Sequence, residues 1–331
     1  MSTEPLATAC TSGPLAHAAR SGPLHIVLNS GSGSRDAEET RSLLAAVFSA
    51  AGRPHEFLQV GASGDIVDTA RQAVEQALAQ GGVVVAAGGD GTINAVAGEA
   101  IGRGCPFGVL PQGTFNYFGR VNGIPQDTEE AARALLHARL TPIQVGRVNG
   151  RLFLVNGSIG LYPQILEDRE ASKRAHGRSR WVALWSAAAT LLRSRHRMRL
   201  EITSDEGAPE LLRTSTLFVG NNRLQLDRIG LEPAHVEALS EGRLTGVSIR
   251  PVGWWTMAGL ALRGALGRLR DADHVRSFVF RRLRVAPRGL RRIKVATDGE
   301  IVWMDTPLVF EVGPEPLLLL VPLPEHQAPV A

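Results

Sequence analysis

Short apolar runs alternate with amphipathic segments over the first 140 residues of the chain. Four segments have the composition and length of strands, at 24–28, 56–60, 83–87 and 107–110. Segments with apolar residues at helical spacing lie between and after them, at 36–51, 65–80, 92–101 and 128–138. Asp127 is a suitable N-cap for the last of these helices. This alternation predicts a mostly parallel sheet with helices on both faces.

The pattern changes near residue 142, beyond which short strand-like runs follow one another with turn residues between them. The expected strands are 143–148, 152–155, 200–203, 214–219, 244–250, 278–284, 293–296, 308–312 and 317–321. Two longer helical segments, 179–195 and 254–270, interrupt them. This order predicts a second, largely antiparallel domain.

Both helical segments of the second half carry tryptophan on an apolar stripe and arginine at their ends. Trp181 and Trp185 lie on the first stripe, and Trp254 and Trp255 open the second. Tryptophan with flanking arginine is typical of a helix that lies on an anionic bilayer, although such stripes also pack on a β domain. The flanking arginines are Arg178, Arg180, Arg193, Arg195, Arg197, Arg263, Arg268 and Arg270.

The distribution of charge favours a polyanionic partner for the second half. Residues 1–143 carry nine basic and 13 acidic side chains, whereas residues 144–331 carry 27 and 19, which are net charges of −4 and +8. A membrane surface, a nucleic acid or a phosphorylated substrate would each fit this excess. No nucleic-acid recognition motif is visible, so we expect no nucleic-acid partner.

The start of the chain and its cysteines indicate the compartment. Residues 1–22 lack a basic start and a long apolar core, so we expect a disordered extension and not a signal peptide. No apolar run reaches the ~18 residues of a transmembrane helix. Two cysteines are too few for a disulfide framework. These features predict a cytoplasmic protein that associates with membranes peripherally.

A glycine-rich loop directly after the expected strand at 83–87 has the composition of a phosphate-binding site. Its residues are Gly88, Gly89, Asp90, Gly91 and Thr92. Glycine lets the backbone turn sharply and approach a ligand closely, and the N–H groups of a following helix favour an anion. The Asp90 carboxylate suits Mg²⁺ held through water.

Two further loops of similar composition follow strands of the same expected sheet. The first follows the strand at 24–28 and consists of Asn29, Ser30, Gly31, Ser32 and Gly33. The second spans residues 110–116. Ligands of open α/β sheets bind outside the carboxyl ends of the strands. Three such loops at one sheet edge therefore predict a phosphate cradle.

In this order, the three loops and a later Asp-Gly-Glu sequence resemble motifs of the diacylglycerol kinase catalytic-domain family. Residues 29–33 resemble its Asn-Pro-x-Ser-Gly loop, and residues 88–95 resemble its Gly-Gly-Asp-Gly-Thr-x-Asn-Glu loop. Residues 110–120 resemble its Leu-Pro-x-Gly-Thr-x-Asn-x-Phe-Ala-Arg loop, and residues 298–300 are the Asp-Gly-Glu. The family includes bacterial lipid kinases and sphingosine and ceramide kinases, and is more distantly related to NAD kinases. The resemblance extends over residues 24–323.

The resemblance implies a fold of two domains. The first is a doubly wound parallel α/β nucleotide-binding domain of the NAD kinase type, formed by residues 23–142 and about 314–323. The second is an antiparallel β-sandwich domain for the lipid substrate, formed by residues 143–313.

The resemblance also implies roles for individual residues, with ATP and Mg²⁺ as cofactors. The nucleotide and its phosphates would contact Asn29, Ser30, Gly31, Ser32, Gly33, Gly88, Gly89, Asp90, Gly91, Thr92, Asn94, Gly113, Thr114 and Asn116. Asp90 would also hold Mg²⁺ for catalysis. Asp298 and Glu300 are the candidates to deprotonate the substrate hydroxyl. The family's motif slightly favours Glu300 as the general base. Asp298 would then bind a metal, or would itself be the base.

The chain departs from the family pattern at several positions that bear on metal binding. Ala95 and Gln144 stand where other members have carboxylates, which removes anchors for a metal–water network. Glu241 and Gly242 correspond to an Asp-Gly pair that carries a structural Mg²⁺ in some members, so Glu241 is a second candidate metal ligand. Whether that Mg²⁺ is retained stays open. The other departures are Ser30, Val60 and Tyr117.

Together these features predict an ATP-dependent lipid kinase that transfers the γ-phosphoryl group of MgATP to a lipid hydroxyl, most simply that of diacylglycerol. An NAD kinase-like phosphotransferase and a catalytically weak lipid- or nucleotide-binding regulator are the alternatives. The expected partners are the lipid substrate and an anionic membrane surface bound through the Arg/Trp helices. The sequence leaves open which lipid is phosphorylated and whether the chain forms a homodimer.

Overall fold

The computed structural model divides the chain into two compact units. One comprises Met1–Val145 and Pro314–Ala331, and the other comprises Gly146–Gly313. The structure describes residues 14–29, 37–61, 65–113, 115–161, 163, 197–205, 207–253, 255–256, 259, 263 and 274–329. Within these ranges, no helix has both the length and the apolarity needed to cross a bilayer.

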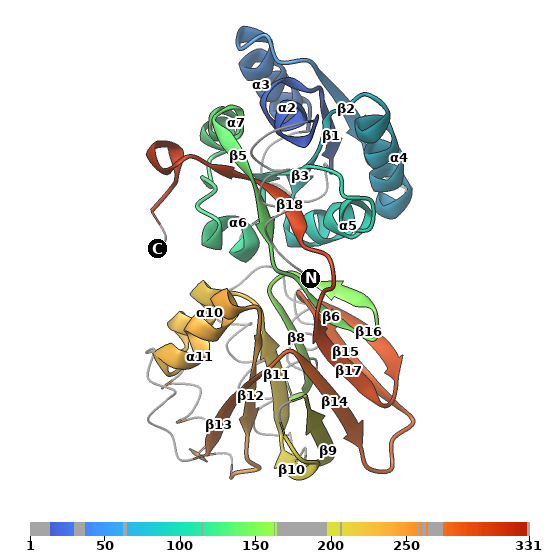
Figure 1. Cartoon of the computed structure of the whole chain (residues 1–331), viewed down its shortest axis with the longest axis vertical. Helices are drawn as coiled ribbons and strands as arrows, with labels where there is room; N and C mark the ends of the chain where they lie inside the picture. Colours follow the sequence, from blue (N-terminus) through green and yellow to red (C-terminus); the bar gives the residue numbers. More distant parts are fainter. Residues whose placement is uncertain are drawn as a thin grey trace. The chain divides into compact units, whose positions relative to one another are not determined.

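A six-stranded sheet forms the centre of the first unit (Figure 1). In spatial order its strands are β2 (His55–Gln59), β1 (Leu24–Leu28), β3 (Val83–Gly88), β4 (Phe107–Pro111), β18 (Leu317–Pro322) and β5 (Ala138–Ile143). Neighbouring strands are parallel except for β5, which pairs antiparallel with β18. Every residue of β1, β3, β4 and β18 is buried, as expected for strands covered on both faces.

Helices cover both faces of this sheet. α4 (Ile66–Ala79) packs against α5 (Asp90–Ile101), and α3 (Ala37–Ala50) packs against α7 (Thr128–Leu136). Figure 1 shows the two pairs on opposite sides of the sheet. The Asp127 carboxylate accepts from the N–H groups of Glu129 and Glu130 at 2.9 and 3.1 Å, which confirms Asp127 as the N-cap of α7.

The prediction of a disordered extension over residues 1–22 is wrong for residues 14–21, which form α2 (Pro14–Ser21) with a buried alanine face. The guanidinium group of Arg53 holds this helix. It donates to the carbonyls of Ala18 and Ala19 at 3.0 and 3.1 Å, and to that of Arg20. These carbonyls belong to the last turn of α2, where backbone acceptors run out of N–H partners; the Ala18 carbonyl also accepts from the Gly22 N–H at 3.1 Å. Burial lowers the pKa of Arg53 to about 10.

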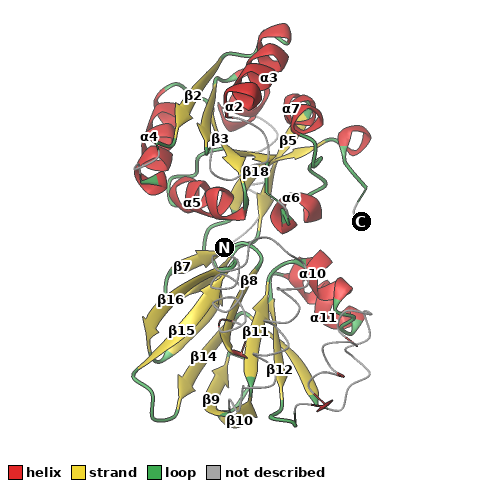
Figure 2. Ribbon diagram, turned by 180° about the vertical axis from the view of Figure 1, so that it is seen from behind, coloured by secondary structure: helices red, strands yellow, loops and turns green. Residues whose placement is uncertain are grey.

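Two six-stranded antiparallel sheets form the second unit, and Figure 2 shows their strands in yellow. In spatial order, the first sheet contains β10 (Glu210–Thr214), β9 (Met198–Ser204), β14 (Arg282–Pro287), β17 (Leu308–Val312), β6 (Gly146–Val148) and β7 (Arg151–Phe153). The second contains β13 (Val275–Phe280), β12 (Leu244–Ile249), β11 (Thr216–Gly220), β8 (Asn156–Gly160), β15 (Arg292–Thr297) and β16 (Glu300–Asp305).

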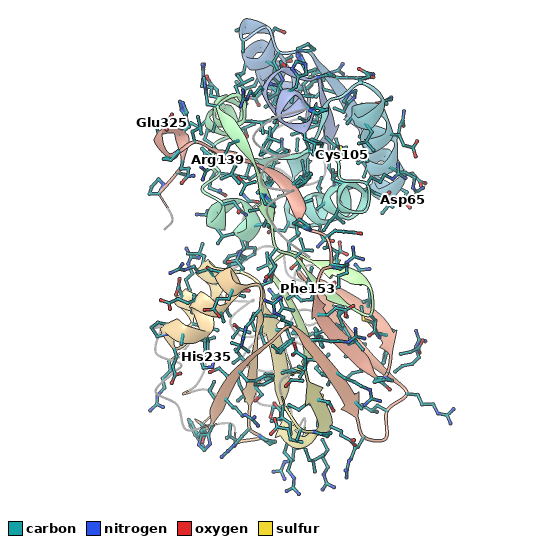
Figure 3. All side chains as sticks on the ribbon, in the orientation of Figure 1. Asp65, Cys105, Arg139, Phe153, His235 and Glu325 are labelled. Atoms are coloured by element: carbon teal, nitrogen blue, oxygen red, sulfur yellow. The ribbon has the colours of Figure 1, made fainter. Side chains whose placement is uncertain are left out.

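Both sheets of the second unit bury apolar side chains in one shared core. Phe153 of β7 and Phe310 of β17 come from the first sheet, and Ile159 of β8 comes from the second. Phe153 is labelled in Figure 3. Two sheets packed face to face over such a core make a β-sandwich, so the predicted fold class is confirmed.

Several elements differ from the sequence prediction. The strand expected at 143–148 is two strands, β5 and β6, which belong to different units. The strand expected at 278–284 is also two strands, β13 and β14, in different sheets of the sandwich. The short helices α10 (Arg223–Arg228) and α11 (Pro233–Glu237) were not expected. The helix expected at 179–195 and most of that expected at 254–270 lie outside the described residues.

Candidate functional site

The order of the strands in the first unit places a reversal of the chain between β1 and β3. From β1 the chain passes through α3 to β2 on one side, whereas from β3 it passes through α5 to β4 on the other. Leu28 of β1 is in register with Ala87 of β3, so both strands end at the same edge. Ligands of open α/β sheets bind outside the carboxyl ends of the strands at such a reversal.

Asn29 and Thr92 join the end of β1 to the start of α5. Asn29 Nδ2 donates to Thr92 Oγ1 at 3.0 Å, and the Asn29 N–H donates to the Ala87 carbonyl at 3.1 Å. Thr92 packs directly on Gly88, because a Cβ at position 88 would lie 2.5 Å from Thr92 Oγ1. Glycine at this position therefore permits the bond that connects the first two loops.

The start of α5 is open to an anion. Gly89 is the N-cap residue and supplies no side-chain hydrogen bond to the first turn. N–H groups at the start of a helix have no acceptor within the helix and carry a partial positive charge. Gly91 in the same turn is exposed. This arrangement suits a phosphate group.

Asn116 holds the third loop against the second. Its backbone is left-handed, with φ 47° and ψ 41°, which asparagine tolerates better than most residues. Its buried Oδ1 accepts from the Gly113 N–H at 3.1 Å. Its Nδ2 donates to the Gly113 carbonyl at 2.8 Å and to Gln126 Oε1 at 3.0 Å. Gly113 in turn adjoins Gly89, since a Cβ at position 113 would lie 3.0 Å from the Gly89 Cα.

Asp90 places a carboxylate at this meeting point of the loops. The Asn116 N–H donates to Asp90 Oδ2 at 3.1 Å, whereas Oδ1 is buried and has no hydrogen-bond partner. Burial raises the pKa of this carboxyl, and the N–H groups of Asn116 and Tyr117 and the charge of Arg120 partly offset the increase. A buried carboxylate oxygen is costly unless a cation or a water binds it. Mg²⁺ prefers carboxylate oxygens together with water and phosphate ligands, so Asp90 fits this ion.

In the second unit, Asp298 and Gly299 form a two-residue turn between β15 and β16. Their φ values are 48° and 91°, as in the tight turns that match the twist of paired strands. Asp298 Oδ2 accepts from the Leu154 N–H at 2.7 Å. Its Oδ1 accepts from the N–H groups of Val155 and Asn156, each at 2.9 Å. Both oxygens are therefore used to hold the segment that connects β7 and β8.

Glu300 begins β16 and is more accessible. Its side chain is 55% exposed, and its Oε2 accepts from Arg151 Nη2 at 2.6 Å. Thr297 orients Arg151, because Thr297 Oγ1 accepts from Arg151 Nε at 3.0 Å. No other described residue bonds to the Glu300 carboxylate. Its Oε1 can therefore receive a proton from a substrate.

Polar residues beside this turn were missed from the sequence. Asn156 is 4% exposed, and its Nδ2 donates to Gln225 Oε1 at 3.1 Å, while its Oδ1 is buried without a partner. Asn222 caps α10 by accepting from the Gln225 N–H at 3.0 Å. Asn221 Nδ2 donates to the Leu154 carbonyl at 3.0 Å. In the sequence these asparagines look like ordinary turn residues.

The first unit also matches a known family in sequence. Residues 23–148 match the model of the diacylglycerol kinase catalytic domain. This part of the chain is thus similar to that domain. A Pseudomonas aeruginosa protein described as a probable lipid kinase YegS-like is 46% identical over 121 residues, which are 35% of this chain and 38% of that protein. The diacylglycerol kinase of Bacillus subtilis is 33% identical over 132 residues, which are 39% of this chain and 43% of that protein.

The fold similarity extends further than the sequence similarity. A putative diacylglycerol kinase from Bacillus anthracis superposes with a TM-score of 0.70 at 19% identity, over 92% of this chain and 98% of the other. This shows a shared fold. In sequence, by contrast, the chain matches less than half the length of its curated diacylglycerol and lipid kinase relatives.

The first unit brings the predicted residues of three loops together. They are Asn29, Gly88, Gly89, Asp90, Gly91, Thr92, Gly113 and Asn116. Asn94 lies about one turn after Asp90 on α5. Asp298 and Glu300 lie on one hairpin of the second unit. The predicted residues outside the described part are Ser30, Gly31, Ser32, Gly33 and Thr114.

The groups around Glu241 do not fit the structural Mg²⁺ of some diacylglycerol kinase family members. The Glu241 side chain is 68% exposed, and Arg243 Nε lies 4.0 Å from its Oε2. Arg281 Nη2 donates to the Glu241 carbonyl at 3.0 Å, and the Ala238 carbonyl already accepts from the Arg243 N–H. Two guanidinium groups repel a cation. No group of three or more metal-binding side chains occurs in the described part of the chain.

Proposed function

We propose that the chain is an ATP-dependent lipid kinase, which transfers the γ-phosphoryl group of MgATP to a lipid hydroxyl, most simply that of diacylglycerol. The observation that carries this proposal is the buried, unpartnered Oδ1 of Asp90 beside the uncapped start of α5. A cation site and an anion site that adjoin at a chain reversal suit a nucleoside triphosphate with its Mg²⁺. The similarity of residues 23–148 to the diacylglycerol kinase catalytic domain supports a lipid as the acceptor.

In the first unit, the chain's own groups would bind and orient the phosphates. The first-turn N–H groups of α5 would donate to phosphate oxygens, and Gly113 would let the third loop approach them closely. Asn116 would keep Asp90 Oδ1 directed to the ligand by holding Oδ2. When bound, Mg²⁺ would neutralise negative charge on the phosphates, with Asp90 as its protein ligand.

In the second unit, we assign the general base to Glu300. Asp298 already accepts three backbone N–H groups, whereas Glu300 is more than half exposed and pairs with Arg151 alone among the described residues. A general base needs an oxygen within reach of the hydroxyl proton. Glu300 would accept that proton while the hydroxyl oxygen bonds to the γ-phosphorus and the bond to the leaving ADP breaks. Arg151 would orient Glu300, and Asp298 would hold the turn.

An acceptor panel tests this proposal. The purified protein receives γ-labelled MgATP with diacylglycerol in detergent micelles, with a sphingoid base in the same micelles, or with NAD⁺ in solution. We expect label in a lipid product, and the labelled lipid identifies the substrate class. Label on NAD⁺ alone would instead assign an NAD kinase-like activity. Nucleotide binding without transfer to any acceptor would favour a lipid- or nucleotide-binding regulator.

A further inference from the structure

A basic hollow lies at the open edge of the sandwich, away from the groups assigned to catalysis in the second unit. It has a volume of about 400 Å³ and is lined by residues 211–213 of β10, Ser248 of β12, Arg250, Pro251 and Arg276 of β13. Among the described strands, β10 lies at one edge of the first sheet and β13 lies at one edge of the second. Arg276 connects these edges, because its Nη1 and Nη2 bond to the Glu210 carboxylate at 3.0 and 2.8 Å.

The charges around this basic hollow are not balanced by the protein. Arg213 lies directly opposite Arg199 in the pairing of β10 with β9, and both are exposed. Like charges at such a position destabilise a sheet. In the described part of the chain, no acidic side chain pairs with Arg199, Arg213 or Arg250. Glu210 pairs with Arg276, and Glu201 lies on the same face of β9 as Arg199, opposite Leu211. The four arginines here therefore exceed the two acids, which indicates an external anion.

Exposed apolar side chains accompany the arginines. Leu211, which lines the basic hollow, is 44% exposed. Trp255 follows Pro251 by four residues and is 73% exposed. A small soluble anion would not contact exposed leucine and tryptophan side chains. A bilayer surface would, because tryptophan is favoured at the interface and apolar side chains enter the acyl region beside basic residues that contact the headgroups.

We propose that the basic hollow is a docking site for the phosphate headgroups of anionic phospholipids at a bilayer surface. Arg213, Arg250 and Arg276 contact the phosphates, while Leu211 and Trp255 enter the interface. The arginines are exposed, so each contributes a small and salt-sensitive increment, and docking depends on their sum. This inference rests on the proposed function in one respect: docking would bring the protein to a lipid substrate that resides in the bilayer.

The test is sedimentation of the full chain with vesicles of phosphatidylcholine alone or mixed with phosphatidylglycerol. The variant is Arg213→Glu/Arg250→Glu. The matched control is Arg282→Glu/Arg284→Glu, which changes the net charge equally on β14, two strands from β10 in the same sheet. We expect the first variant to lose at least about tenfold in binding to the mixed vesicles, with the control within about twofold of the wild type. Wild-type binding should weaken with added salt and be slight on phosphatidylcholine alone.

Other results would overturn the docking site. Equal losses in the variant and its control would mean that only net charge matters. Full competition by millimolar glycerol phosphate would assign a soluble phosphate ligand, and stronger binding to duplex DNA than to vesicles would assign a nucleic acid. Transfer to micellar diacylglycerol is measured in parallel and should be equal in the variant and the wild type. Lost vesicle binding in a protein without kinase activity would leave the docking site standing and refute the proposed function.

Discussion

Asp298 and Asn156 bond to each other twice. The Asp298 N–H donates to the Asn156 carbonyl at 3.0 Å, and the Asn156 N–H donates to Asp298 Oδ1 at 2.9 Å. This closed pair fastens the start of β8 to the turn that follows β15, its neighbour in the sheet. Asp298, which in sequence looks like a catalytic base, therefore accepts hydrogen bonds from the backbone. Glu300 is the accessible carboxylate of the motif.

Replacing Asp298 by asparagine should destabilise the second unit. Asparagine keeps the size of the side chain, but it loses the charge and presents an N–H₂ group to backbone donors that need an acceptor. We expect the free energy of unfolding to fall by about 1–3 kcal/mol, measured by urea denaturation. Glu300→Gln is the matched control and should stay within about 0.5 kcal/mol of the wild type. Equal losses in both variants would refute the division of roles.

Asp90→Asn should abolish most phosphoryl transfer without unfolding the protein. The variant removes a buried charge, so its unfolding transition should be no lower than that of the wild type. We expect kcat to fall by at least about 100-fold, because Mg²⁺ loses its protein ligand. Burial raises the pKa of Asp90, so protons compete with Mg²⁺ there, and the Mg²⁺ concentration for half-maximal rate should rise as the pH falls. An unchanged Mg²⁺ dependence in the variant would remove Asp90 from the metal site.

Asn116 can be tested through its backbone and its side chain separately. Asn116→Ala loses the bonds to Gly113 and Gln126 and places alanine in a left-handed conformation, whereas Asn116→Gly loses only the bonds. We expect the alanine variant to be less stable than the glycine variant by about 1–2 kcal/mol in urea denaturation. Both should raise the KM for ATP, since both release Asp90 and the third loop. An alanine variant as stable as the glycine variant would contradict the left-handed backbone.

His25 should make the stability of the first unit depend on pH. It is 1% exposed on β1, neither ring nitrogen has a hydrogen-bond partner, and Glu56 lies 3.7 Å away. Burial lowers the pKa of His25 below 6.5, and the charge of Glu56 and the neighbouring Gln76 side chain offset part of the shift. Between that lowered pKa and 6.5, the unfolded chain binds more protons than the folded chain. The free energy of unfolding should therefore be highest above pH 6.5 and decrease as the pH falls toward the folded-state pKa.

The variant His25→Leu provides the comparison for this pH dependence. Its free energy of unfolding should change less with pH than that of the wild type, measured by urea denaturation from about pH 5 to 7.5. Parallel curves for the two proteins over this range would place the titrating group elsewhere.

The loops of the first unit could be predicted because their signals are local. Residues 88–92 contain the end of a strand, a glycine turn and the start of a helix in one continuous stretch. The alternation of strands and helices then predicts at which edge of the sheet the loops lie. The bond between Asn29 and Thr92 is consistent with that expectation. The same local reasoning located Asp127 at the start of α7.

The remaining features depend on contacts between distant parts of the chain. The partners of Asp298 lie at least 142 residues earlier in the sequence, so the motif alone could not separate its role from that of Glu300. The helix α2 depends on Arg53, more than 30 residues later. The basic hollow combines edge strands of two sheets, and no single stretch of sequence contains it.

The most direct test of the central claim is a single-turnover measurement of γ-phosphoryl transfer from MgATP to diacylglycerol, by the wild-type protein and by Glu300→Gln. Both proteins must first give matching unfolding curves and matching MgATP binding. We expect phosphatidic acid to form with the wild type and its rate of formation to fall by about 100- to 10,000-fold in the variant. Equal rates in the two proteins would contradict Glu300 as the base, and no phosphorylated lipid from a wild-type protein that binds MgATP would contradict the lipid kinase itself.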